Sequence, residues 1–257
     1  MTNFILKGDW LHGLGYFIFF YVSIFVIEIL SAKFQFTNTA IKKPKKEIGM
    51  TILFIVIGIV ALILNFSIKN SETQVGLLYH IPVMFLMFFF TLPVGLFIYL
   101  LINKYRLKEL GLKFKPIKIF LLGIIIWVTT GLFALIFNYD GVLWSAGYKE
   151  LGGTLGIILQ GVLGAALVEE FTRYILQTRF QYLIKNTGFS ILLASFIWAF
   201  MHFPVNYFKG NEISGIFTYC IQIIPLGFIW GFITHRTKSI LPSVFAHGLN
   251  LWGFQNG

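Results

Sequence analysis

The chain has 257 residues, of which 57% are hydrophobic and 12% charged, and its mean hydropathy is +0.82. Soluble globular proteins are about 45–50% apolar and about 25% charged. This composition excludes a water-soluble enzyme, because too few polar side chains remain to cover its surface. At about 20 apolar residues per span, the length predicts roughly eight transmembrane helices in one domain, residues 1–257. No room remains for a separate soluble catalytic domain.

Eight apolar stretches, each bounded by charged or turn residues, are the expected transmembrane helices. In chain order they cover residues 11–31, 49–68, 76–102, 119–138, 154–176, 189–207, 214–234 and 240–255. The last stretch is short and has Pro242 near its beginning. The expected fold class is therefore an all-α polytopic membrane protein.

The net charge of +10 is explained by membrane orientation rather than by nucleic-acid binding. If the loops alternate between the two sides, sixteen of the twenty Lys and Arg residues fall on one side. The positive-inside rule assigns that side to the cytoplasm and puts both termini outside. We expect a multi-pass protein of a prokaryotic cytoplasmic membrane, with the lipid bilayer as its surroundings and no nucleic-acid partner.

Ionisable side chains inside membrane spans are rare and mark functional sites. Of the ten acidic residues, only Glu28, Glu169 and Glu170 lie within the expected spans, and Glu28 is expected to be an interfacial anchor near a helix end. Arg173 follows Glu169 by four residues and Glu170 by three, so on a helix it can reach either carboxylate. The other carboxylate then remains available as a general base. A buried structural ion cluster is the alternative explanation of this spacing.

Two histidines, His202 and His247, lie within the sixth and eighth expected spans. Asn206 follows His202 by four residues and Asn250 follows His247 by three, so each histidine has an amide on its own helix face. Carboxylates, imidazoles and carboxamides around one point supply a base, an orienting group and donors to an oxyanion. Helices five, six and eight are therefore expected to form an intramembrane hydrolytic site. A lone membrane histidine is otherwise a helix–helix hydrogen-bonding residue.

The depths of these residues in the bilayer do not agree completely. The two glutamates lie just past the middle of the fifth span, on its basic inner side. His202, with the sixth span at residues 189–207, lies slightly beyond the midplane on the outer side. A shifted or tilted sixth span is needed to bring the groups together.

Other known chemistries for cutting peptides inside membranes are excluded by the motifs. The only aspartates, Asp9 and Asp140, lie outside the spans, so an aspartyl mechanism is excluded. No histidine is followed by glutamate, so an H-E-x-x-H zinc site is absent. The Gly-x-Ser-Gly string of an intramembrane serine protease is also absent. A site built from glutamate and histidine remains.

The sequence resembles the CAAX protease and bacteriocin-processing (CPBP, Abi) family of intramembrane glutamate endopeptidases. Its motifs E-E-x-x-x-R, F-x-x-x-H and H-x-x-x-N/D correspond here to EEFTR at 169–173, WAFMH at 198–202 and HGLN at 247–250. The resemblance covers residues 105–257. All three motifs depart from the pattern: the first is one residue short, Trp198 replaces phenylalanine, and asparagine comes at the third position after histidine, with Leu251 at the fourth.

The resemblance implies a catalytic mechanism for the site. Glu169 or Glu170 activates a water molecule with help from His202. His247 and Asn250 then stabilise the oxyanion. Which glutamate is the base is left open.

The resemblance also implies supporting residues. Arg173 holds whichever glutamate is not the base, Trp198 forms an aromatic wall, and Asn206 compensates for the displaced asparagine of the third motif. A divalent metal such as zinc is left open, because two histidines and two glutamates can ligate zinc with an open water position. Its ligands would be Glu169, Glu170, His202 and His247, as in a metalloprotease-like site.

We expect an intramembrane endopeptidase, similar to CAAX prenyl endopeptidases, with a site accessible from the cytoplasmic side. Its partner would be a membrane-associated or lipidated peptide or protein substrate. One alternative is a catalytically decayed family member that acts as an immunity or scaffold protein, as the altered motif spacing suggests. Another is a small ion or proton transporter, for which buried Glu, His and Arg are also typical.

Overall fold

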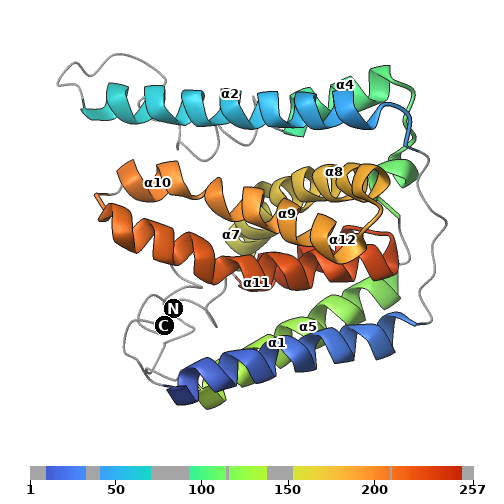
Figure 1. Ribbon diagram of the computed structural model, residues 1–257, viewed down its shortest axis with the longest axis vertical. Coiled ribbons are helices and arrows are strands. Elements are labelled where there is room, and N and C mark those ends of the chain that lie inside the picture. Colours follow the sequence, from blue (N-terminus) through green and yellow to red (C-terminus); the bar gives the residue numbers. More distant parts are fainter. Residues whose placement is uncertain are drawn as a thin grey trace.

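The computed structural model describes residues 10–32, 41–70, 93–113, 116–137, 153–208 and 210–250. Within these ranges every regular element is a helix (Figure 1), which confirms the expected all-α class for this part of the chain. The helices are α1 (Trp10–Ser31), α2 (Pro44–Asn70), α4 (Pro93–Ile102), the 3₁₀-helix η2 (Leu107–Leu110), α5 (Pro116–Phe137), α7 (Gly153–Gly156), the π-helix η3 (Ile157–Ala166), α8 (Leu167–Ile184), α9 (Thr187–Phe200), α10 (Phe203–Phe208), α11 (Ile213–Thr237) and α12 (Leu241–Asn250).

Three of the described helical segments are long and apolar enough to cross a membrane. They are Gly153–Ile184, Thr187–Phe208 and Ile213–Thr237, which correspond to the fifth, sixth and seventh expected spans. Helices α1, α2 and α5 cover the first, second and fourth expected spans. Much of the third span and the end of the eighth lie outside the described residues. The total of eight spans therefore stays a prediction.

The helices lie side by side in layers (Figure 1). Helices α2 and α4 lie along one side, α1 and α5 along the opposite side, and α8, α9, α11 and α12 between them. In the middle, α9 packs against α8 and α11, while α12 packs against η3, α5 and α11. Large apolar side chains of the outer helices are exposed, for example Phe17 at 63% and Phe25 at 65%. Such exposure is expected where the surrounding solvent is lipid.

Two glycines allow the central helices to approach closely enough to form the site. A Cβ atom at Gly227 on α11 would lie 2.8 Å from the ring of Trp198 on α9. A Cβ atom at Gly248 on α12 would lie 2.7 Å from Val162 on η3. Any larger residue would therefore push α9 from α11, or α12 from η3.

A buried ion pair, which we call the α2–α8 clamp, ties the beginning of α2 to the end of α8. Arg179 Nε donates to Glu47 Oε2 at 2.7 Å, and the Tyr105 hydroxyl donates to Glu47 Oε1 at 2.7 Å. The backbone N–H of Lys42 donates to the Tyr105 oxygen at 2.8 Å. Burial and the hydrogen bond to Glu47 raise the pKa of Tyr105 to about 12. Sequence analysis missed this clamp, because 132 positions separate Glu47 from Arg179.

Candidate active site

The two motif glutamates lie in the first turn of α8, directly after the π-helix η3, and have different partners. Glu170 is buried, and its Oε2 accepts a hydrogen bond from Arg173 Nη2. The side chain of Glu169 is 16% exposed, and its Oε2 accepts from the indole Nε1 of Trp198 at 2.5 Å. The structure thus resolves the alternative left open by the spacing: Arg173 neutralises Glu170, and Glu169 is held by an uncharged donor.

His247 on α12 connects the two glutamates. Its Nδ1 lies 3.0 Å from Glu170 Oε1, and its Nε2 lies 3.7 Å from Glu169 Oε2. Because an ionised carboxylate only accepts hydrogen bonds, His247 donates through Nδ1. The imidazole is stacked on the ring of Trp230, with 3.9 Å between centroids and 14° between planes. The ring is therefore fixed from its edge and from its face.

His202 lies in a short turn rather than within a continuous helix. Helix α9 ends at Phe200 and α10 begins at Phe203, so a turn interrupts the sixth span, which runs over Thr187–Phe208. His202 Nδ1 lies 3.1 Å from the carbonyl oxygen of Trp198, and its Nε2 lies 3.8 Å from Glu169 Oε2. The turn thus holds His202 beside Glu169.

Four of the predicted site residues thus converge from three segments that are distant in the sequence. The Nε2 atoms of His202 and His247 both face Glu169 Oε2, at 3.8 and 3.7 Å. Both distances are longer than a direct hydrogen bond. The arrangement gathers one carboxylate and two imidazoles around one point, with Glu170 and Arg173 buried behind it.

The C-terminal part of the chain matches a known family. Residues 151–252 match the profile of the Rce1-like family, described as type II CAAX prenyl endopeptidase Rce1-like. This stretch contains all three motifs. This part of the chain is thus similar to the CAAX proteases. The match begins at residue 151, so the resemblance predicted for residues 105–150 stays a prediction. No curated protein and no solved structure matched the chain significantly.

The two asparagines predicted to support the candidate site have different outcomes. Asn206 Nδ2 donates to the carbonyl oxygen of His202 at 2.9 Å, and its Oδ1 accepts from Asn211 Nδ2 at 3.2 Å. It therefore secures the turn that carries His202, and its amide group is already engaged there. Asn250 is the last residue of α12, and its side chain lies outside the described part, as does Leu251. The oxyanion role of Asn250 stays a prediction.

Aromatic rings surround the charged groups of the site. Trp198 packs edge-to-face against His202 and against Trp230, with centroid distances of 5.0 and 5.5 Å. The guanidinium carbon of Arg173 lies 5.7 Å from the ring centroids of both tryptophans. The predicted aromatic wall at Trp198 is thus present, and its indole N–H is an additional donor. Sequence analysis missed Trp230, because it belongs to none of the motifs.

The metal considered from the sequence has no ligand cluster of its own here. Among the described residues, no group of three or more His, Cys, Asp or Glu side chains is arranged to hold a metal ion. Both oxygens of Glu170 already have partners, Arg173 and His247. The Nδ1 atoms of both histidines are engaged, and their Nε2 atoms face Glu169. Zinc binding by Glu169, Glu170, His202 and His247 stays a prediction.

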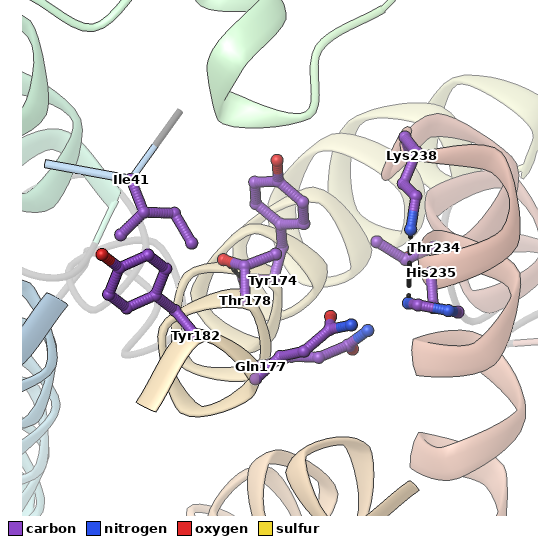
Figure 2. A pocket seen from close by; sticks show the side chains of 9 residues that line it. Ile41, Tyr174, Gln177, Thr178, Tyr182, Thr234, His235 and Lys238 are labelled. Atoms are coloured by element: carbon purple, nitrogen blue, oxygen red, sulfur yellow. Dashed lines mark hydrogen bonds between the residues drawn. The ribbon is translucent and has the colours of Figure 1, made fainter. Parts of the chain in front are cut away.

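A separate pocket of about 250 Å³ lies between α8 and the C-terminal end of α11 (Figure 2). Its lining includes Tyr174, Gln177, Thr234, His235 and Lys238, and none of the proposed catalytic residues. Lys238 Nζ lies 3.4 Å from His235 Nδ1 (Figure 2). Burial, reinforced by Arg236, lowers the pKa of Lys238. The candidate active site is therefore the glutamate–histidine cluster and not this pocket.

Proposed function

We propose that the chain is an intramembrane endopeptidase in which Glu169 activates water to hydrolyse a peptide bond. One observation carries this proposal: Glu169 faces the Nε2 atoms of His202 and His247, while its neighbour Glu170 is neutralised by Arg173. A carboxylate held in this way can accept a proton from water. The family match to CAAX prenyl endopeptidases supports peptide-bond hydrolysis as the reaction class.

The reaction begins with a water molecule bound between Glu169 and His202. Glu169 takes one proton as the water oxygen adds to the carbonyl carbon, and the carbonyl π electrons move to its oxygen. This oxyanion then re-forms the carbonyl and breaks the C–N bond. The proton held by Glu169 passes to the leaving nitrogen, so one water molecule is consumed overall.

His247 stabilises the oxyanion in this mechanism. Glu170 accepts the Nδ1–H of His247, which orients the ring and stabilises a protonated imidazole. The Nε2–H of the protonated ring then donates a hydrogen bond to the oxyanion, with Asn250 as the second donor. With His247 protonated, the charges of Glu169 and Glu170 are balanced by Arg173 and His247. Such balance is required of buried ionised groups.

The proposed mechanism is metal-free, because the carboxylate and imidazole groups themselves supply the base and the oxyanion donor. The proposed substrate is a membrane-associated or lipidated peptide or protein whose scissile bond reaches Glu169 from the cytoplasmic side. The asymmetry of the basic residues supports this orientation.

The alternatives are less well supported. A decayed scaffold or immunity protein would not need to keep Glu169, His202 and His247 in convergence, and the described residues retain it. A transporter would also use buried ionisable groups, but the family match favours a hydrolase.

The test is cleavage of fluorogenic lipidated and unmodified peptides by purified protein in proteoliposomes. Glu169→Gln should lower kcat by about 10²–10⁴-fold, the usual contribution of a general base. Glu28→Gln is the matched control, because Glu28 is 51% exposed and pairs with Arg236 away from the site. Wild-type rates for Glu169→Gln would overturn the proposal, as would the absence of cleavage of every peptide by the wild type.

A further inference from the structure

Trp198 is linked to both water-activating groups through two different atoms. Its indole Nε1 donates to Glu169 Oε2 at 2.5 Å, and its backbone carbonyl oxygen lies 3.1 Å from His202 Nδ1. We propose that Trp198 is a positioning residue that fixes the carboxylate of Glu169 and the tautomer of His202. This inference rests on the proposed function for its catalytic consequence but not for its geometry.

The backbone carbonyl of Trp198 determines the tautomer of His202. A carbonyl oxygen only accepts hydrogen bonds, so the bonded Nδ1 must carry the proton. In the neutral imidazole, Nε2 is then an acceptor. This acceptor faces Glu169 at 3.8 Å. His202 and Glu169 therefore present two acceptors to a water molecule, which orients its two protons.

The indole acts on Glu169 in a way that differs from the action of Arg173 on Glu170. Arg173 forms an ion pair and cancels the charge of Glu170. The indole N–H is uncharged, so it orients Glu169 and leaves its negative charge in place. Two adjacent carboxylates thus receive different environments, one with a cation and the other with a neutral donor.

Packing keeps the indole in this position. Trp198 is 4% exposed and lies edge-to-face against Trp230. A Cβ atom at Gly227 would lie only 2.8 Å from its ring, so α11 closes one side of the ring. The donor is therefore held in place by the helix interface.

Phenylalanine is the informative substitution, because the family motif has phenylalanine at the position of Trp198. Trp198→Phe keeps an aromatic ring and the backbone carbonyl but removes the N–H. We expect kcat to fall about tenfold or more, as for loss of a hydrogen bond to a charged group, with KM unchanged. Trp127→Phe on α5 is the matched control and should change neither constant. Unchanged kcat in Trp198→Phe, or a rise in KM alone, would overturn the inference.

A double-mutant cycle tests whether Trp198 acts through Glu169. In the Glu169→Ala background, Trp198→Phe should produce no further loss of residual cleavage, because the acceptor is already gone. Independent, additive losses would show that Trp198 acts on the reaction in another way.

A spectroscopic measurement separates this inference from the proposed function. The ¹⁵N–¹H indole resonance of Trp198, assigned by its loss in Trp198→Phe, should move to higher field in Glu169→Ala and stay in place in Glu28→Ala. Imidazole ¹⁵N shifts should show His202 protonated at Nδ1. An unmoved indole resonance would overturn the inference even in an active protease. A moved resonance without peptide cleavage would overturn only the proposed function.

Discussion

His247 Nδ1 lies 3.0 Å from Glu170 Oε1, although the two residues are 77 positions apart in the sequence. Both side chains are buried, and the other oxygen of Glu170 bonds Arg173. Glu170 therefore holds α12 to α8 at the point where the proposed reaction takes place. Glu170 thus stabilises the helix packing and orients His247 for the proposed reaction. Thermal unfolding measures the first effect, and peptide cleavage measures the second.

Removing the charge of Glu170 should destabilise the protein. Glu170→Gln leaves Arg173 buried without its counter-ion, which costs about 3–5 kcal/mol in comparable cases. Glu28→Gln breaks an ion pair that is half exposed and should cost about 0–1 kcal/mol. Thermal unfolding in detergent measures both. Equal midpoints for the two variants would contradict the buried pairing of Glu170 with Arg173.

The α2–α8 clamp should make stability depend on alkaline pH. The pKa of Tyr105 is raised from its ordinary value of 10.0 to about 12. A raised pKa stabilises the protonated folded form, so this contribution is complete below about pH 10 and is lost as pH rises to about 12. The free energy of unfolding of the wild type should therefore fall between about pH 10 and about pH 12.

Tyr105→Phe is the control for this pH dependence. It removes the hydroxyl that donates to Glu47 and should cost about 1–2 kcal/mol near neutral pH. It should also lose the part of the alkaline dependence that comes from Tyr105. Unfolding curves collected from pH 8 to pH 12 would refute this account if both proteins lost stability in parallel.

Gly227→Ala should disturb the site through packing alone. The added methyl group would lie 2.8 Å from Trp198 and must displace its ring, at a cost of about 1–3 kcal/mol. Because Trp198 holds Glu169, kcat should fall as well. Gly215→Ala, on the same helix with nothing within 4 Å of the added atom, should leave stability and kcat near wild type. Peptide cleavage and thermal unfolding of the two variants provide the comparison.

Chelators should leave peptide cleavage unchanged. In the proposed mechanism Glu169 supplies the base and His247 the oxyanion donor, so no metal ion is required. Treatment with EDTA and with 1,10-phenanthroline, followed by metal analysis of the purified protein, tests this directly. Loss of cleavage that is restored by added zinc would contradict the metal-free mechanism.

Sequence alone indicated the class of the protein and named the candidate site residues. A low charge and long apolar runs are properties of local composition, so the all-α membrane class could be predicted without contacts. The three motifs named Glu169, Glu170, His202 and His247, because each motif is short and contiguous. The family match over residues 151–252 covers the part of the chain that contains these motifs.

Only the tertiary structure decided how these residues are used. Spacing let Arg173 reach either glutamate, and in the structure it pairs with Glu170, which also bonds His247 Nδ1. The indole donor and the Glu47–Arg179 clamp lack a sequence signature of their own. Both are interactions between side chains brought together by packing, and a linear pattern does not encode distances between segments.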